Sequence, residues 1–220
     1  MCEFVFHPDE WPKPVEMVDG PWNCPYPSSA GTDYCIFHMM HKTRQRKFKS
    51  NAEIELEQAR AIRSTGFISI LCTTLENIDI SKLSKLIFRD SQIQVGYSTI
   101  AGKLDFSEET IDRQVWIEDC YINEYDSINT IYNSGLAIKQ SEMLDFKLSN
   151  STTNGKLTFV GSIFQDAAFI ETDFNVSVSF SKRIPDALPL SDVDEAIGAR
   201  PCTFSNTPEF MGAQFNSNVS

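Results

Sequence analysis

Three cysteines and one histidine near the N-terminus have the types and spacing to bind a metal ion. Cys35 and His38 lie three residues apart, so one tight turn can point both side chains at the same ion. Cys24 lies eleven residues before Cys35, and Cys2 stands at the start of the sequence. Three sulfur ligands and one imidazole suit a closed, tetrahedral zinc site. We therefore predict a structural zinc ion bound by Cys2, Cys24, Cys35 and His38.

Other interpretations of these residues stay open. Six cysteines could form three disulfides in a secreted protein, but the sequence begins Met1-Cys2-Glu3, without the basic and apolar regions of a secretory signal. Cys35 and His38 could instead form a nucleophilic pair, although no Asn or Asp stands out to orient the imidazole. The three cysteines could also be unrelated thiols. His41 is a spare candidate ligand, and His7 is expected at the surface.

The predicted ligands lie in a segment that is too short and too rich in proline to build a hydrophobic core of its own. The prolines between them are Pro8, Pro12, Pro14, Pro21, Pro25 and Pro27. A bound metal would supply folding energy to such a segment. We assign residues 1–49 to a small Cys/His-rich module.

This module ends in a basic run over residues 42–49, which holds five cations and no acid. The run could form a small patch for nucleic acid, acidic lipid or an acidic protein. Because it is short and contains a single aromatic residue, Phe48, we interpret it as a solvated linker.

A connecting helix is predicted over residues 50–66. Ser50 and Glu53 have the spacing of a capping box, and Gly66 is a typical C-terminal residue. Leu56, Ala59 and the residues around Ile62 give a narrow apolar stripe. Such a helix is expected to cover another element, and the domain that follows offers an open end.

Phenylalanine recurs at intervals of five residues in the C-terminal half of the chain. A period of five fits neither a helix, which has 3.6 residues per turn, nor a strand, which has a period of two. It keeps one side chain inward only if the backbone turns a corner in every repeat, and four such corners close a square coil. Shorter runs at this interval begin at Leu83, Ile117 and Ile138. The predicted inward residues of the repeats are Phe159, Phe164, Phe169, Phe174, Phe204, Phe210 and Phe215.

These repeats resemble the pentapeptide-repeat proteins, whose pattern is a small residue, Asp or Asn, Leu or Phe, and two polar positions. The segments 167–171 (AAFIE) and 172–176 (TDFNV) match it well. The resemblance implies a mainly β fold with a right-handed quadrilateral β-helix over residues 67–220. The Cys/His-rich head resembles that of archaeal members of the family.

Two features depart from this pattern. Residues 182–200 lack it, and we expect them to form an inserted loop that includes a short helix capped by Ser191 and ended by Gly198. Many repeat centres are Ile instead of Leu or Phe. An irregular β-sandwich with Phe-rich strands is the alternative architecture.

The charge balance argues against direct binding of nucleic acid. The chain has 30 acids and 19 bases, a net charge of −11, whereas phosphate contacts need clustered cations. No histidine follows His41, and no glycine-rich phosphate-binding motif is present. We therefore predict a non-enzymatic binding or scaffold protein that recognises a protein partner. An enzyme would need an open zinc position, which a four-ligand set does not leave.

Acidic residues are concentrated in residues 105–126, where we expect outward positions. They are Asp105, Glu108, Glu109, Asp112, Glu118, Asp119, Glu124 and Asp126. Some members of the resembled family bind DNA gyrase by imitating DNA, which makes a DNA-mimicking topoisomerase binder the alternative function. A solubilising or salt-tolerant acidic surface is the simpler explanation.

The remaining expectations concern location and assembly. The longest uncharged, apolar-leaning run covers residues 64–75, which is too short to span a bilayer. We expect a cytoplasmic protein. A membrane-linked scaffold with an anchor beyond residue 220, and an end-to-end dimer through the last repeats, are further possibilities.

Overall fold

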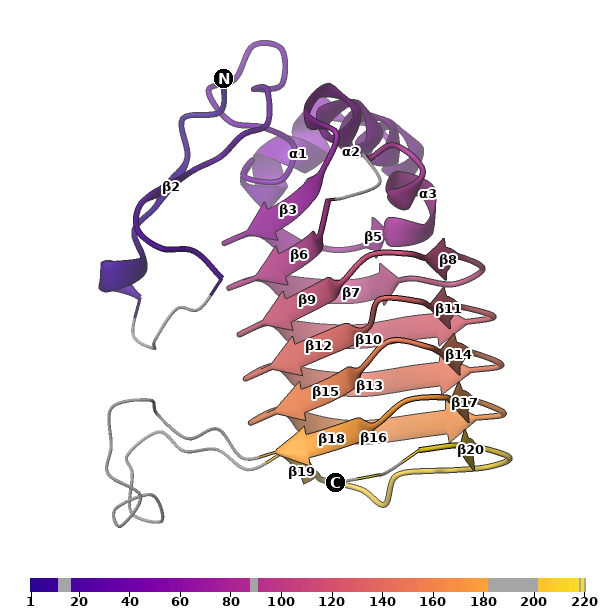
Figure 1. The fold of residues 1–220 in the computed structure, drawn as a ribbon. Helices are drawn as coiled ribbons and strands as arrows, with labels where there is room; N and C mark the ends of the chain where they lie inside the picture. Colours follow the sequence, from indigo (N-terminus) through magenta and orange to yellow (C-terminus); the bar gives the residue numbers. More distant parts are fainter. Residues whose placement is uncertain (12–16, 88–90, 182–201, 218, 220) are drawn as a thin grey trace.

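A stack of parallel β-strands forms most of the molecule; the three helices lie at one end of it, and the N-terminal hairpin runs along its side (Figure 1). The computed structural model describes residues 1–11, 17–87, 91–181, 202–217 and 219. The chain winds as a β-solenoid in which each strand pairs in parallel with the equivalent strand of the next coil. The predicted β-solenoid is therefore confirmed. Among the described residues, no helix has the length and apolar character needed to cross a membrane.

Three sheets run along the stack. The first contains β3 (Ile68–Leu71), β6 (Ile93–Gly96), β9 (Val115–Glu118), β12 (Leu136–Lys139), β15 (Leu157–Val160) and β18 (Val178–Ser181). The second contains β4 (Thr74–Leu75), β5 (Ile78–Asp79), β7 (Thr99–Asp105), β10 (Tyr121–Ile128), β13 (Glu142–Ser149), β16 (Ile163–Ile170) and β19 (Thr203–Phe204). The third contains β8 (Thr110–Ile111), β11 (Ile131–Tyr132), β14 (Thr152–Thr153), β17 (Asp173–Phe174) and β20 (Gln214–Phe215).

The long strands of the second sheet turn a corner. In the pairing of β10 with β13, Ile122 faces Met143 and Glu124 faces Asp145, but the residues between them do not pair. Met143 and Phe146 both point into the core although they are three residues apart, which a straight strand does not allow. The three sheets therefore enclose four sides.

One coil takes 21 residues instead of the 20 that four steps of five would give. Leu136 pairs with Val115 in the coil before it and with Leu157 in the coil after it, 21 residues away in each case. Three steps of five separate Phe159 from Phe174, and a step of six then leads to Phe180, which pairs with Phe159. The predicted period is correct for three sides and wrong for the fourth, where the turn after the third sheet holds one more residue.

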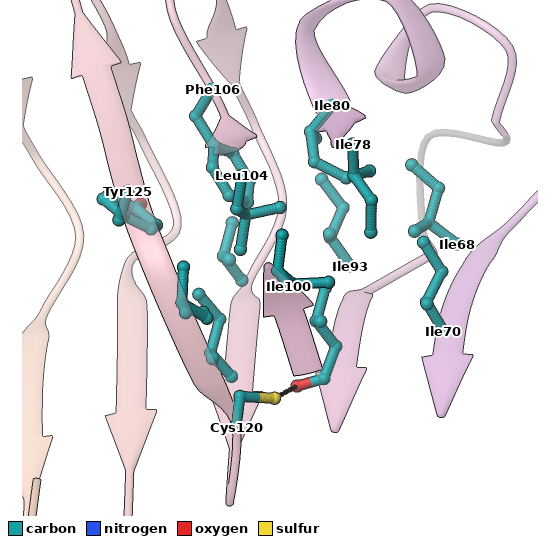
Figure 2. Close-up of a cluster of buried hydrophobic side chains, with 14 of the residues drawn as sticks. Ile68, Ile70, Ile78, Ile80, Ile93, Ile100, Leu104, Phe106, Cys120 and Tyr125 are labelled. Atoms are coloured by element: carbon teal, nitrogen blue, oxygen red, sulfur yellow. Dashed lines mark hydrogen bonds between the residues drawn. The ribbon is translucent and has the colours of Figure 1, made fainter. Parts of the chain in front are cut away.

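Apolar side chains fill the interior of every coil. In the first coils these are aliphatic: Figure 2 shows Ile68, Ile70, Ile93 and Ile100 in the buried cluster. In later coils phenylalanine replaces them, and rings of successive coils stack, as Phe159 does on Phe180 at 4.9 Å between centroids.

The predicted phenylalanine core is confirmed in part. Four of the rings are at most 1% exposed, namely Phe159, Phe164, Phe169 and Phe174. Phe204 is half-buried, and Phe210 and Phe215 continue the inward columns but are 43% and 38% exposed. These two rings stack on Phe169 and Phe174 at 4.9 and 4.7 Å, but no further described coil covers their other side.

Small residues line the corner between the first two sheets because their side chains hydrogen-bond to the backbone of neighbouring strands. The Ser141 hydroxyl accepts the Cys120 N–H at 3.1 Å and donates to the Lys139 carbonyl at 2.9 Å. Ser162 repeats the pattern one coil later, accepting the Ser141 N–H at 3.3 Å. Cys120 occupies the same column, and its sulfur lies 3.3 Å from the Glu118 carbonyl.

A ladder of side-chain hydrogen bonds runs along the surface, at the ends of the strands of the third sheet. Asn154 donates from Nδ2 to the Oδ1 of Asn133 at 2.8 Å, and Asn175 donates to Asn154 at 2.8 Å. Asp112 accepts from Asn133 at one end, and Asn216 donates to Asn175 at the other. Each amide group donates a hydrogen bond to the side-chain oxygen one coil before it, so a continuous line of hydrogen bonds follows this edge.

The first coils depart from the predicted pattern. Leu83 lies in helix α3 (Ile80–Ser84), which Asp79 caps through the Lys82 N–H, so the run that we began at Leu83 is not a set of strands. Phe88 lies outside the described residues. The predicted loop at 182–200, with its helix, also lies outside the described residues. Strands β18 and β19 are equivalent to β15 and β16, and only two residues separate β15 from β16. The longer separation of β18 from β19 is where the insertion was predicted.

Two helices cover the first coil. Helix α2 (Asn51–Thr65) confirms the predicted connecting helix: the Ser50 hydroxyl accepts the Glu53 N–H at 3.3 Å, and Gly66 ends the helix with a φ of 74°. Its Ala61 and Ile62 are buried. The basic run forms helix α1 (His41–Lys47), in which Arg44 is buried. It is therefore not the solvated linker that we expected.

The core contains one hydroxyl that the fold leaves without a hydrogen bond. Thr153 is fully buried, and within the described chain its Oγ1 has no partner. We expect Thr153→Val to raise the free energy of unfolding by about 1 kcal/mol, because valine keeps the shape and removes a desolvated polar group. Urea denaturation measures the change.

Thr172 provides the matched control. It is equally buried, but its hydroxyl donates to the carbonyls of Leu148 and Ile170, both at 3.1 Å. Thr172→Val should lower stability. Equal effects of the two substitutions would contradict the analysis.

Candidate metal centre

The four predicted ligands come together at the end of the stack. The Sγ atoms of Cys2, Cys24 and Cys35 and a ring nitrogen of His38 all lie within 4.8 Å of one another. The two sulfurs of Cys24 and Cys35 are 3.6 Å apart, and Nδ1 of His38 lies 3.3 Å from the sulfur of Cys35. Ligands at bond lengths of about 2.0–2.3 Å from a tetrahedral ion would be separated by roughly 3.4–3.8 Å. The cluster therefore has the donor set and approximate size for a metal ion.

All six cysteines carry free thiols, so the alternative of three disulfides is wrong. His41 and His7 do not join the cluster. Nδ1 of His41 faces a carboxylate oxygen of Glu76 at 3.6 Å, and His7 is exposed.

A short antiparallel hairpin carries Cys2 and Cys24. Strands β1 (Val5–Phe6) and β2 (Trp22–Asn23) pair, and the Cys24 N–H donates to the carbonyl of Phe4 at 3.0 Å. The Cys2 N–H donates to the carbonyl of Tyr26, also at 3.0 Å. These bonds place the two sulfurs together although 22 positions separate the residues.

A tight turn presents the other two ligands, as the spacing predicted. The N–H groups of His38 and Met39 both donate to the carbonyl of Cys35, at 3.2 and 2.9 Å. The Cys35 N–H points at the sulfur of Cys2 at 3.3 Å, which ties the turn to the hairpin.

The backbone of the first coil fixes the orientation of the imidazole. Nε2 of His38 lies 2.8 Å from the carbonyl oxygen of Leu71, at the end of β3. A carbonyl can only accept, so Nε2 carries the proton and Nδ1 presents its lone pair to the three sulfurs. Phe4 stacks on the imidazole with 3.9 Å between ring centroids. This arrangement, in which a backbone carbonyl orients a metal-binding histidine, is typical of metal sites.

The thiols are arranged so that one of them ionises readily. The hydrogen bond from Cys24 holds the pKa of Cys35 at about 4. The same hydrogen bond, together with burial, raises the pKa of Cys24 far above its usual value. Burial also raises the pKa of Cys2. A metal ion would replace the protons that Cys24 and Cys2 otherwise keep.

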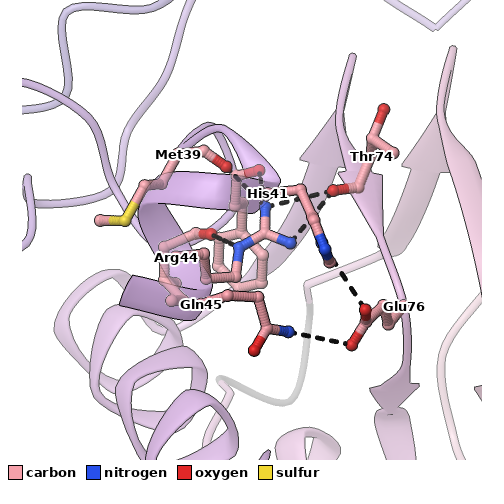
Figure 3. Close-up of polar contacts among 8 residues, drawn as sticks. Met39, His41, Arg44, Gln45, Thr74 and Glu76 are labelled. Atoms are coloured by element: carbon pink, nitrogen blue, oxygen red, sulfur yellow. Dashed lines mark hydrogen bonds and ion pairs between the residues drawn. The ribbon is translucent and has the colours of Figure 1, made fainter. Parts of the chain in front are cut away.

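Arg44 joins the module to the solenoid, a role that the sequence did not indicate. It is 3% exposed and donates to four carbonyls: those of Ile36, Phe37 and Met39 in the module, and that of Thr74 in β4 (Figure 3). A planar guanidinium suits this task because it holds several donors in fixed directions. The only hint of this burial in the sequence is that apolar residues, Phe37 and Met39, precede Arg44, and both are buried.

Tyr26 makes a second polar link. Its ring is fully buried against Phe37, and its hydroxyl accepts the N–H of Ser69 in β3 at 2.8 Å. Both Arg44 and Tyr26 thus connect the metal-binding module to backbone groups of the first coil.

The acidic residues predicted as one outward surface do not all lie there. Glu118 in β9 is fully buried, and Asp119 accepts the indole N–H of Trp11 at 2.7 Å. Glu124 and Asp126 in β10 both contact Lys103, at 3.0 and 2.5 Å. The acids therefore do not form one exposed surface, because Glu118 and Asp126 are buried and Lys103 pairs with Glu124 and Asp126.

The other four acids are also divided among several places. Glu109 pairs with Lys85 at 2.8 Å, and Asp112 begins the asparagine ladder. Asp105 accepts the Ser107 N–H at 2.9 Å, and Glu108 occupies a corner with a φ of 62°. The eight acids therefore belong to different sides of the coil.

No family model matches the chain, and neither a curated protein nor a solved structure matches it. The solenoid and the Cys/His cluster consequently stand on the geometry described above.

Replacement of Arg44 tests the link between the module and the solenoid. We expect Arg44→Lys to lower the free energy of unfolding by at least about 2 kcal/mol, because an ammonium cannot reach four buried carbonyls and leaves some unsatisfied. Arg46→Lys, in the same helix but exposed, should change it by less than about 0.5 kcal/mol. Equal urea midpoints for the two variants would refute a structural role for Arg44.

Proposed function

We propose that this protein is a non-enzymatic binding scaffold, in which a structural zinc ion holds the N-terminal module on a β-solenoid that recognises a basic protein surface. The observation that carries the binding role is a row of carboxylates along one side of the stack. Glu124 pairs with Asp145, and Asp145 with Asp166, in neighbouring strands. Carboxylates in this row therefore repeat at about the strand spacing of 4.8 Å.

The carboxylates of the row lie close enough to act on one another. Burial and the nearby carboxylates of Asp126, Glu124 and Asp166 raise the pKa of Asp145 above its usual value. Asp145 and Asp166 are exposed, so a partner with correspondingly spaced cations could reach them. The eight acids of residues 105–126 are divided among the sides of the coil, and we do not extend the proposal to imitation of DNA.

Zinc is the ion that the donor set favours. Three thiolates and one imidazole are soft or borderline ligands, and they complete a tetrahedral coordination sphere without a water. Zinc bound in this way would stabilise the fold and would leave no position for a substrate. Cys35 is fully buried, which also does not suit a nucleophile. Because the three cysteine ligands must stay reduced, we propose a cytoplasmic location.

Metal content and stability test the zinc assignment. We expect one zinc ion per chain, and its removal by a chelator should lower the thermal midpoint because the ion binds the folded state alone. Cys35→Ala should lose the metal, whereas Cys202→Ala, a cysteine outside the cluster, should keep it. Protein that is free of metal but equally stable would contradict the assignment. In a cobalt-substituted sample, a spectrum that azide changes would indicate an open, enzyme-like position.

A lysine-rich peptide tests the carboxylate row. The triple variant Glu124→Gln, Asp145→Asn and Asp166→Asn should bind decalysine about five- to tenfold more weakly at low salt, from the loss of two exposed charges and the half-buried charge of Glu124. The control variant Glu3→Gln, Asp33→Asn and Glu108→Gln removes the same charge from exposed positions outside the row. Equal affinities of the two variants, measured by calorimetry, would show that only net charge matters and would reject the row as a binding surface.

A further inference from the structure

The N-terminal hairpin (residues 3–11 and 17–23 in the described chain) brings two of the four metal ligands to the site. Cys2 and Cys24 stand directly outside its two ends, and the pairing of β1 with β2 holds these ends together. The position of the hairpin therefore determines where two of the three sulfurs lie.

The hairpin is fastened to the side of the solenoid, away from the metal ligands. The indole N–H of Trp11 donates to Oδ2 of Asp119 at 2.7 Å, in the corner that follows β9. The N–H of Met17 donates to the hydroxyl of Tyr97 at 3.3 Å, in the equivalent corner one coil earlier. Phe6 stacks on Tyr97 at 5.0 Å, and Trp11 meets the same ring edge-on at 5.5 Å. These contacts leave Tyr97 only 4% exposed.

The other two ligands are held by a different anchor. Nε2 of His38 is bonded to the carbonyl of Leu71, and the Thr73 hydroxyl donates to the carbonyl of Phe37, both in the first coil. The four ligands thus belong to two pieces of chain, each fixed separately to the solenoid. The metal site lies where the two pieces meet.

We infer that Trp11 and Asp119 are positioning residues for the metal centre. Neither belongs to the four-ligand cluster, but their hydrogen bond holds the hairpin, and the hairpin holds Cys2 and Cys24. Docking raises the effective concentration of these two thiolates at the ion, since the ligands need not be gathered from a free chain. By thermodynamic linkage, metal binding must strengthen hairpin docking by the same factor. This inference rests on the proposed metal site.

Substitutions of Asp119 can separate the loss of the hydrogen bond from backbone strain, because its backbone has a left-handed conformation. Its φ is 48°, a conformation that Asn tolerates well and Ala does not. Asp119→Asn keeps both the backbone and an oxygen that can accept the indole N–H. Asp119→Ala removes the acceptor. Asn129→Ala, at another exposed corner with a φ of 54°, imposes a similar backbone cost without touching the hairpin.

The experiment measures zinc affinity of the full chain by competition with a chromophoric chelator. Trp11→Ala and Asp119→Ala should weaken binding about tenfold, an effect typical of residues that act through a ligand. Asp119→Asn and Asn129→Ala should bind within about twofold of the wild type. Cobalt spectra of the weakened variants should still show three thiolate ligands, because the ligand set is unchanged.

A nuclear magnetic resonance measurement tests the reverse direction. Zinc removal from the wild type should shift or broaden the indole N–H resonance of Trp11, assigned by its loss in Trp11→Phe. Wild-type affinity in both Trp11→Ala and Asp119→Ala would overturn the inference while leaving the zinc site in place. A wild-type protein that binds no metal would overturn the proposed zinc site and this inference with it.

Discussion

Parallel pairing between successive coils requires equivalent residues to lie directly above one another, and most features of this molecule follow from that requirement. Once Val115, Leu136 and Leu157 are stacked, every other residue of the coil is placed as well. Phenylalanine rings then meet face to face, wall hydroxyls reach the next backbone, and surface amides form a ladder. These are consequences of a single register, so they appear together in the later coils and are incomplete in the first ones.

A stack of this kind has two ends, and each exposes unpaired strand edges and apolar rings. At the N-terminal end, α2 supplies Ala61 and Ile62 as a lid over the first coil. The module also packs against the first coils through apolar side chains, among them Phe6, Ile36 and Phe37. Buried polar groups add to this packing: Arg44 and Tyr26 bond to backbone groups of the first coil, and Leu71 receives the imidazole of His38. Such bonds are directional, and they fix one arrangement of the module where apolar contact would permit several.

The sequence was sufficient for the general architecture and for the four clustered side chains. Regular phenylalanine spacing indicated a coil, and the Cys/His spacing indicated a tight turn. The extra residue in the turn after the third sheet could not be predicted. The inward residue that follows this turn differs from coil to coil, as Ile138 and Phe180 show. The burial of Glu118 and the burial of Arg44 depend on contacts with segments that are distant in the sequence. The carbonyl of Leu71 carries no signal at all in the sequence, since every residue has one.

From β9 to β18 the coil length is constant, and this has an evolutionary consequence. Because residues 21 positions apart are equivalent, a duplicated or deleted stretch of 21 residues would leave each neighbouring coil with the same partner as before. The asparagines at positions 133, 154 and 175 show the result of such equivalence, since each makes the same bond to its predecessor. A protein built in this way can change its length by tandem duplication within its gene, without new packing having to arise. Its reach could therefore be adjusted in whole coils while both ends stay unchanged.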